Sequence, residues 1–387
     1  MLERQVTEMF SDVSVVPCGD YARETVERAL AEVLAPIGGL EWVKPGMRIA
    51  IKANLVTFMK PESAATTHPQ LLETLCRMLT ERGAEVVVGD SPGGPWNAAS
   101  VGVVYNATGV HAVEAVGAKL NRNFSQRDVH FPEGKICRDF PFTSWLDDAD
   151  AVIDFCKLKT HAMAGMSCAV KNFFGVIPGT RKPEFHYLYP QIENFSDMLI
   201  DLNLFVRPRL TIVDAVTCME GNGPTQGTPR HMGALIASES AYCADLLCAH
   251  LIGLEPENCP TVAASVERGL CPATWEELHI HGDITPFVQP DFEKMPLRGG
   301  VEFFGQSKLV LHFLNRCFGA YPKVDGRKCV ACGKCADTCP MHTIRIRGGR
   351  AVIDRGSCIR CFCCQEFCPR GAISVGRTAL AKLAEKF

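Results

Sequence analysis

Short apolar runs alternate with helix-like segments between about residue 42 and residue 240. Four of these runs are rich in β-branched residues and are bounded by glycine, proline or polar residues, which is typical of strands. They cover residues 47–52, 84–90, 149–161 and 209–216. Strands that alternate with helices predict an α/β domain with a largely parallel sheet and flanking helices.

The segment between the first two strands predicts a helix. Thr67 is placed to cap its start, Gln70 to complete a capping box, and Gly83 to end it. Its apolar stripe consists of Leu71, Leu72, Leu75, Cys76 and Leu79. A strand, a helix and a parallel strand form a right-handed crossover by default. A second apolar segment, 241–253, predicts a helix that is buried on more than one side.

The alternating rhythm is lost after about residue 284, where prolines and the Gly299–Gly300 pair are frequent. We therefore predict an α/β domain over residues 1–295 and a connector over 296–322, which includes a helix-like piece at 308–318. A small α+β ferredoxin-like domain with a C-terminal helix is predicted over 323–387.

The last unit contains the same cysteine spacing twice. Each copy is C-x2-C-x2-C-x3-C-P, the run that binds cubane iron-sulfur clusters, and the fourth cysteine of each run binds the other cluster. One predicted [4Fe-4S] ligand set is Cys329, Cys332, Cys335 and Cys368. The second set is Cys358, Cys361, Cys364 and Cys339. A zinc site is disfavoured because it needs closed four-residue sets with longer separations.

The segment between the two runs alternates apolar and polar residues around Gly348–Gly349, which predicts a β-hairpin. Its Ile344, Ile346 and Val352 are expected to share a face that covers a cluster. Cys363 is an extra thiol that we interpret as a small packed residue. Residues 321–375 resemble bacterial-type two-cluster ferredoxins in their motifs, and the resemblance implies electron transfer to a redox partner protein.

Charge is distributed unevenly along a chain whose net charge is -3. From residue 325 to the end there are twelve basic and five acidic residues. We interpret this excess as compensation for anionic clusters, and we expect no nucleic-acid partner because no basic face interleaved with aromatic residues is present. Neither a signal peptide nor an apolar run long enough for a membrane span is found, so a cytoplasmic location with reduced thiols is expected.

Polar residues follow several predicted strands of the larger domain. Because carboxyl ends of parallel strands meet at one edge, these residues are expected to form a site. Basic residues, Arg181 among them, outnumber acidic ones there, which predicts a small anionic ligand. The alternative is that the lysines are solvated strand-end residues. The candidate ligand-binding residues are Lys52, Asn54, His68, Asp90, Ser91, Lys157, Lys171 and Asn222, and the candidate catalytic residues are His161, Lys159 and Glu220.

Five segments together resemble the domain-of-unknown-function 362 family over residues 13–253. They are KANL at 52–55, THPQ at 67–70, GDSPGG at 89–94, KLKTH with VKNFFGVIPG at 157–179, and DAVTCMEGNGPTQGTPR at 214–230. The family is similar at a distance to lactate-racemase-type proteins, which implies an anionic substrate and transfers no catalytic residue. The sequence offers no basis for a nickel cofactor.

The leading hypothesis is an iron-sulfur oxidoreductase that relays electrons between a partner protein and an anionic substrate or cofactor. A flavin-like carrier would help to join one-electron clusters to a two-electron conversion, although the sequence does not show one. One alternative is a non-enzymatic electron carrier or assembly module. Another is an isomerase or lyase whose clusters are structural.

Overall fold

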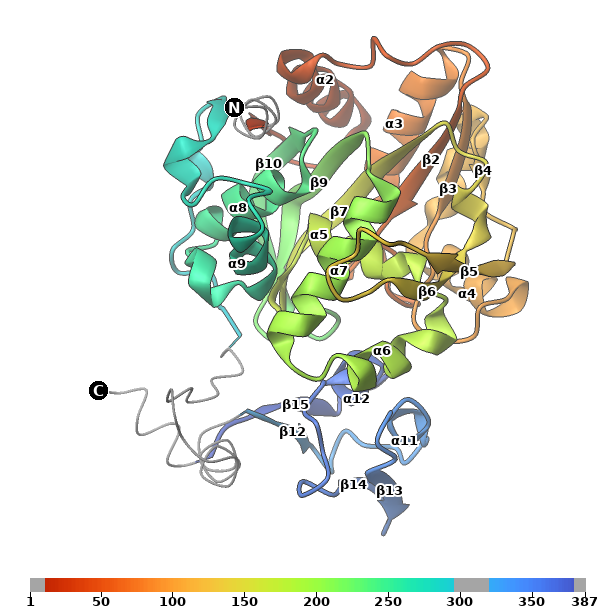
Figure 1. Cartoon of the computed structure of the whole chain (residues 1–387), viewed down its shortest axis with the longest axis vertical. Helices are drawn as coiled ribbons and strands as arrows, with labels where there is room; N and C mark the ends of the chain where they lie inside the picture. The colour runs from red at the N-terminus through yellow and green to blue at the C-terminus, as the bar shows by residue number, and fades with distance from the viewer. Residues whose placement is uncertain (1–10, 296–319, 379–387) are drawn as a thin grey trace.

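The computed structural model describes residues 11–295 and 320–378. It has a nine-stranded, mostly parallel sheet with helices on both faces and a small C-terminal unit below one end of the sheet (Figure 1). The strand order is β11-β1-β10-β9-β7-β2-β3-β4, and β8 pairs with the end of β7. The predicted α/β class with an appended ferredoxin-like unit is thus confirmed. Most of the predicted connector, including its helix-like piece, lies outside the described residues.

The parallel part of the sheet contains the predicted strands. These are β2 (Arg48–Ala53), β3 (Glu85–Gly89), β4 (Lys119–Leu120), β7 (Ala151–His161) and β9 (Leu210–Glu220). β9 continues four residues beyond its predicted end because it pairs with an antiparallel strand. That antiparallel strand is β10 (Thr228–Ser238). The remaining strands of the sheet are β1 (Asp12–Pro17), β8 (Gly165–Ser167) and β11 (His279–His281).

Each face of the sheet is covered by a hydrophobic core. One core packs under α2 (Arg23–Leu34), α3 (Pro69–Thr80) and α4 (Ala98–Thr108). The opposite core packs under α5 (Ala169–Asn172), α7 (Ile192–Val206), α8 (Ala241–Leu251) and α9 (Pro260–Glu267). The short α6 (Lys182–Leu188) and the hairpin of β5 (Gln126–His130) and β6 (Asp139–Thr143) extend the second core, to which they contribute Phe185, Val129, Phe140 and Phe142.

The start of α3 differs from its prediction. The N-cap is His68, whose Nδ1 accepts a hydrogen bond of 3.3 Å from the Gln70 N–H. The Thr67 hydroxyl accepts instead from the Asn54 N–H and donates to the Phe155 carbonyl. Thr67 therefore ties β7 to the chain that follows β2.

The C-terminal unit consists of two antiparallel strand pairs, of which one is a hairpin, and two single-turn helices. The strands are β12 (Tyr321–Val324) with β15 (Ile373–Gly376), and β13 (Ile344–Arg347) with β14 (Arg350–Ile353). The helices are α11 (Lys334–Asp337) and α12 (Cys363–Glu366). Ile346 pairs with Ala351, whereas Val352 pairs with Arg345. The expectation that Val352 shares the Ile344 face is therefore wrong, because a two-residue turn places Val352 on the opposite face.

No described helix has the length and apolarity that crossing a membrane requires.

Candidate functional site

A small, partly open cavity lies where the strand ends of the larger domain meet the C-terminal unit. Its volume is about 40 Å³. The wall is formed by the loops after β2 and β3 and by the end of β7. Helices α5, α6 and α12, with the residue after α12, complete it. The polar and charged wall residues include Asn54, Asp90, Lys159, Lys171, Asn172, Lys182, His186 and Glu366. This volume accommodates roughly three water-sized groups, so the cavity fits a ligand of only a few atoms.

Three lysines reach this cavity without an acidic partner. Lys159 Nζ donates to Asn54 Oδ1 at 2.7 Å and to the Ala65 carbonyl at 2.6 Å, and Lys182 Nζ donates to the Ser91 carbonyl. Among the residues described, no carboxylate forms an ion pair with Lys159, Lys171 or Lys182. An anion would compensate these charges.

Burial sets the protonation of these three side chains. Burial, together with the smaller effect of the neighbouring charge of Lys171, lowers the pKa of Lys159 to about 7. Burial also lowers the pKa of Lys182 to about 8 and lowers that of Lys171. The cavity therefore gains or loses positive charge near neutral pH.

Lys52 and Asp90 lie beside the same cavity but neutralise each other. Lys52 Nζ is 2.7 Å from Asp90 Oδ1, and it also donates to the Ala53 carbonyl and to Asn172 Oδ1. Asp90 Oδ2 accepts from the Leu55 N–H. A Cβ on Gly175 would lie 2.6 Å from Lys52 Nζ, so this position needs glycine for the close approach.

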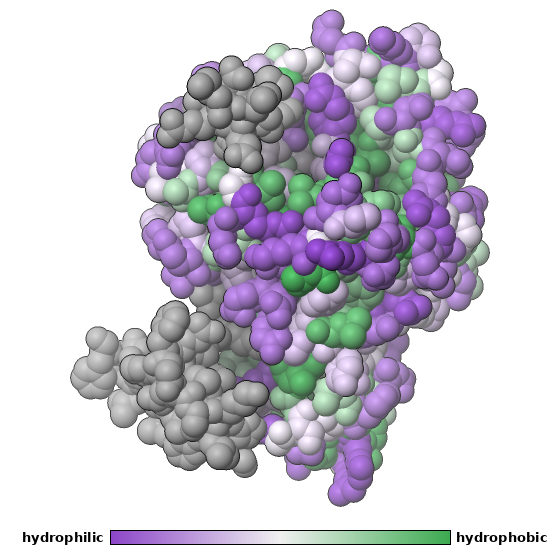
Figure 2. Space-filling model, viewed as in Figure 1, coloured by the Kyte–Doolittle hydropathy of each residue, from purple (hydrophilic) through white to green (hydrophobic). Residues whose placement is uncertain are grey.

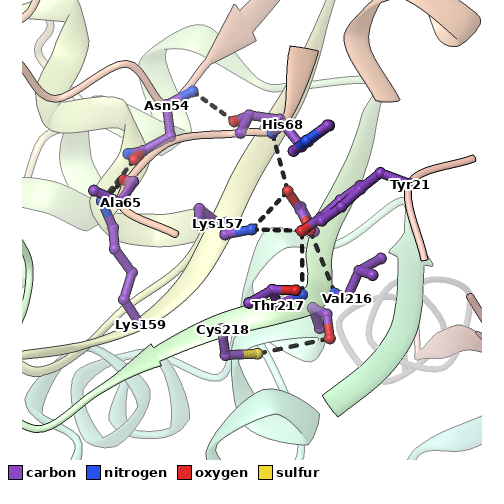
Figure 3. A network of polar contacts seen from close by, with 12 residues as sticks. Tyr21, Asn54, Ala65, His68, Lys157, Lys159, Val216, Thr217 and Cys218 are labelled. Carbon is purple, nitrogen blue, oxygen red and sulfur yellow. Dashed lines mark hydrogen bonds and ion pairs between the residues drawn. The ribbon is translucent and has the colours of Figure 1, made fainter. Parts of the chain in front are cut away.

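Lys157 belongs to a second buried network, shown in Figure 3. Its Nζ is 2.8 Å from Asp214 Oδ2 and 2.9 Å from the Tyr21 hydroxyl. Asp214 also accepts from that hydroxyl and from the His68 N–H. The His68 ring stacks on Tyr21 at 3.6 Å, and burial lowers the pKa of His68 to about 4. Lys157 is thus fully paired, and neither it nor His68 is a wall residue of the cavity.

His161 ends β7 as a neutral ring. Its Nδ1 accepts from the Met163 and Ala164 N–H groups at 3.0 and 3.2 Å. The remaining hydrogen is therefore on Nε2, which has no hydrogen-bond partner among the described residues and lies 4.0 Å from Glu366 Oε2. Burial holds the pKa of His161 well below its usual value.

The C-terminal unit closes the cavity with the segment between Cys364 and Cys368. Glu366 and Phe367 are wall residues, and Phe367 packs on Gly93. Gln365 donates to the Asn222 and Gly223 carbonyls at 3.0 and 3.1 Å. Two further bonds join the loop after β9 to this segment, from Thr225 to the Glu366 carbonyl and from Gln226 to the Cys368 carbonyl. The roof of the cavity is thus fixed between two predicted iron ligands.

The cysteine pattern is repeated in the backbone as well as in the sequence. The left-handed conformation recurs 29 positions apart at Ala331 and Arg360, at Gly333 and Phe362, and at His342 and Gly371. In each half, a backbone N–H four residues later donates to the last cysteine, at 3.4 Å for Cys339 and 3.2 Å for Cys368. Such N–H groups are suited to bind the charged sulfur of a metal-bound thiolate.

The positions of the cysteines fit both predicted ligand sets. Cys368 of the second run lines one cavity together with Cys329, Cys332 and Cys335 of the first. The second set is also grouped. Burial raises the pKa of Cys358, and the nearby charges of Cys361 and Cys339 raise it further. The donor set is all sulfur, as cubane clusters require. Cys363 is buried at the start of α12.

The predicted site residues fall into separate places. Asn54, Asp90, Lys159 and Lys171 reach the cavity, whereas Lys157 and His68 belong to the Asp214 network. Glu220 accepts from the Glu293 N–H and lies 3.8 Å from Arg230, away from the cavity wall. Asn222 contacts Gln365, and Ser91 offers its carbonyl to Lys182.

Sequence reasoning missed Lys182 and named its neighbour Arg181 instead. Arg181 faces outward and pairs with Glu184 at 2.6 Å, whereas Lys182 begins α6 and points inward. Only the phase of that short helix distinguishes them. Glu366 and Phe367 were also missed, because nothing local indicates that a ferredoxin-like segment covers a distant strand edge.

Comparisons with known proteins cover both parts of the chain. The profile of a family described as "Domain of unknown function (DUF362)" matches residues 49–250, and that of a "4Fe-4S dicluster domain" matches residues 321–369. The thylakoid-associated protein sll1697 of Synechocystis sp. (strain ATCC 27184 / PCC 6803 / Kazusa) is 32% identical over 276 residues, which are 69% of this chain and 83% of that protein.

A solved structure is also similar to this chain. It is the lactate racemase apoprotein from Thermoanaerobacterium thermosaccharolyticum, with 12% identity and a TM-score of 0.40. The match covers 62% of this chain and only 56% of that chain.

Proposed function

The chain belongs to the DUF362 family and carries a C-terminal 4Fe-4S dicluster domain, and on this premise we propose that it is an iron-sulfur oxidoreductase acting on a small anion. One observation carries the proposal. Glu366 and Phe367 lie between Cys364 and Cys368, which are predicted cluster ligands, and also form the roof of the lysine-lined cavity. A shared wall would bring an electron relay next to an anion site.

Two [4Fe-4S] clusters, held by Cys329, Cys332, Cys335 and Cys368 and by Cys358, Cys361, Cys364 and Cys339, would supply single electrons at this wall. The residues of the α/β domain do the rest. Lys159, Lys171 and Lys182 bind the anion and offset the negative charge that develops on it during reduction. Phe174 and Phe367 keep bulk water out of the cavity.

His161 lies outside the cavity wall and is suited to exchange a proton with it through the wall residue Glu366, 4.0 Å away. Its neutral ring holds one hydrogen on Nε2, which is directed toward Glu366, and no described residue accepts it. Lys159, with a pKa of about 7, is a second group that exchanges a proton near neutral pH. Protons are needed at the same place where electrons arrive, because a reduced organic anion is usually more basic than its oxidised form.

The cavity volume narrows the ligand class. About 40 Å³ admits a carboxylate or inorganic oxyanion of a few atoms and leaves no room for a flavin ring system. We therefore propose a small anionic substrate and no organic carrier within this cavity. We also propose a cytoplasmic location. The name of the Synechocystis relative associates that protein with the thylakoid.

Anaerobic cluster reoxidation tests the proposal. The protein should contain eight iron and eight sulfide per chain, as two [4Fe-4S] clusters require. After reduction, a panel of small carboxylates and oxyanions is added, and cluster absorbance is followed. At least one anion should reoxidise wild-type protein, and Lys159→Met should slow the reaction at unchanged iron content. Arg181→Met is the matched control, because it removes a neighbouring but outward charge.

The same measurement separates the alternatives. Reoxidation by no anion would favour an electron carrier whose larger domain only docks a partner. Conversion of an anion in the absence of any reductant, with the clusters unchanged, would favour an isomerase or lyase.

A further inference from the structure

The hairpin of β13 and β14 forms the end of the C-terminal unit that lies farthest from the sheet (Figure 1). Large apolar side chains are exposed there and beside the first cysteine run. Val330 is 56% exposed, Val352 43% and Ile346 39%. Val330 and Ile346 line the cavity of the first cysteine set, whereas Val352 lies on the opposite face of the hairpin.

Arginines accompany Val352 on its face of the hairpin. Residues 323–355 contain eight basic and three acidic side chains. Arg327, Arg347, Arg350 and Val352 line a groove of about 700 Å³ at the turn of the hairpin. No described carboxylate forms an ion pair with Arg347 or Arg350. Hydrophilic residues occupy the lower tip of the molecule in Figure 2, with hydrophobic residues close above them.

This end of the molecule also lies next to the first cysteine set. The Ala351 N–H donates to Cys329 Sγ at 3.4 Å, so the hairpin packs directly on a ligand sulfur. Val330 and Ile346 line the same cavity as the four cysteines. Cys332 is itself exposed. A protein that covers the hairpin would therefore come close to the first cluster, while the second set lies by the roofed cavity.

We propose that the hairpin end docks an acidic protein electron carrier, which exchanges electrons with the cluster of Cys329, Cys332, Cys335 and Cys368. We define the hairpin end as the groove of Arg327, Arg347, Arg350 and Val352, with Val330 and Ile346 on the face toward the cluster. Arginines that only compensate a cluster would be expected to point at its sulfurs, whereas Arg347 and Arg350 are exposed to solvent beside Val352. A basic surface of this kind favours an acidic partner, because opposite charge accelerates association in transient protein contacts.

The inference rests on the clusters of the proposed function but not on its anion cavity. The test uses full-length, cluster-loaded protein and an acidic plant-type [2Fe-2S] ferredoxin as probe. Binding of the oxidised ferredoxin is measured by calorimetry, and cluster reduction by the reduced ferredoxin is measured by stopped flow. Arg347→Glu/Arg350→Glu should weaken binding and slow reduction by about tenfold or more at low salt.

Rising salt should slow the wild-type reaction and bring it toward the rate of the variant, because screening removes the attraction. Lys44→Glu/Arg82→Glu is the matched control, since it makes the same charge change on exposed residues of the α/β domain. Reduction by dithionite should be equally complete in all three proteins. This result shows intact clusters and separates failure of docking from failure of the clusters.

Two outcomes would overturn the proposal. One is equal ferredoxin binding and reduction in both charge-reversed proteins. The other is binding of the wild type to phosphatidylserine vesicles that only the hairpin variant loses, with ferredoxin reduction unaffected, which would assign the arginines to a membrane surface. Loss of anion-driven reoxidation without loss of ferredoxin reduction would instead contradict the proposed function and leave the docking surface standing.

Discussion

Two groups of buried lysines lie within the same domain and differ in their partners. Lys157 has Asp214 and Lys52 has Asp90, and both ion pairs are almost completely buried. Lys159 is as deeply placed, Lys171 slightly less so and Lys182 is half-buried, and these three have only neutral oxygens, aromatic rings or the cavity beside them. The paired lysines complete the fold, whereas the unpaired ones leave positive charge that a ligand must balance.

The largest effect should come from breaking a pair. Asp214→Asn leaves the Lys157 ammonium buried without a counter-charge, which should cost about 3–5 kcal/mol of unfolding free energy. Urea unfolding followed by circular dichroism measures it. Lys157→Met/Asp214→Leu, which removes both charges, should recover a large part of the loss. A loss of unfolding free energy below about 1 kcal/mol in Asp214→Asn would show that this ion pair does not stabilise the fold.

Removing an unpaired lysine should weaken anion binding without lowering stability. Lys171→Met removes a desolvated ammonium, so stability should stay the same or rise. Affinity for the anion should fall about tenfold or more, because a charge-assisted hydrogen bond is worth roughly 1.5–3 kcal/mol. Calorimetry with an anion identified by the reoxidation screen measures both quantities when combined with urea unfolding. A destabilised protein with unchanged affinity would place Lys171 among the structural lysines.

The pH dependence should sharpen the contrast further. The pKa of Lys159 is lowered from 10.5 to about 7, so its charge disappears as pH rises through 7. Anion affinity should therefore fall above pH 7, by at most about tenfold per pH unit for one linked proton. The free energy of unfolding should instead rise with pH between about 7 and 10.5, because in that range Lys159 binds a proton in the unfolded chain and not in the folded one. Lys159→Met should flatten both profiles, and a wild-type affinity independent of pH from 6 to 9 would contradict the assignment.

The smallest expected effect concerns the roof. Gln365→Ala removes donors to the Asn222 and Gly223 carbonyls and should weaken the contact between the two units by about 1 kcal/mol. Hydrogen exchange in residues 221–227 should become faster, while iron content and the exchange of β2 and β7 stay unchanged. Unaltered exchange in this loop would show that the bonds from Thr225 and Gln226 suffice.

Much of the fold could be predicted because its signals are local. The β-branched run at 47–52 became β2 within one residue at each end, and the glycine pair at 348–349 became the turn of the hairpin. β10 was not predicted, and β9 was predicted too short, because antiparallel pairing between them depends on tertiary contacts. Thr67 was assigned the wrong role because two strands compete for its hydroxyl.

The candidate site was predictable in outline only. Lys159 and Asn54 meet at the strand ends, as the topology of parallel strands predicts. Whether a strand-end lysine faces an acid or a cavity depends on residues far away in the sequence, and Asp214, 57 positions from Lys157, is the clearest case. The same holds for the roof, since Glu366 approaches His161 from a separate unit.

That roof has a consequence for how the protein would respond to oxygen or to a shortage of iron. Glu366 and Phe367 are held in place by flanking cysteines, and a unit of this size depends on its metal to stay folded. A chain that lost its clusters would also lose the lid, and water entering the cavity would let the pKa of Lys159 return toward 10.5. Damage to the clusters would thus disable substrate capture together with electron supply, so an oxidised chain could not sequester its ligand unproductively.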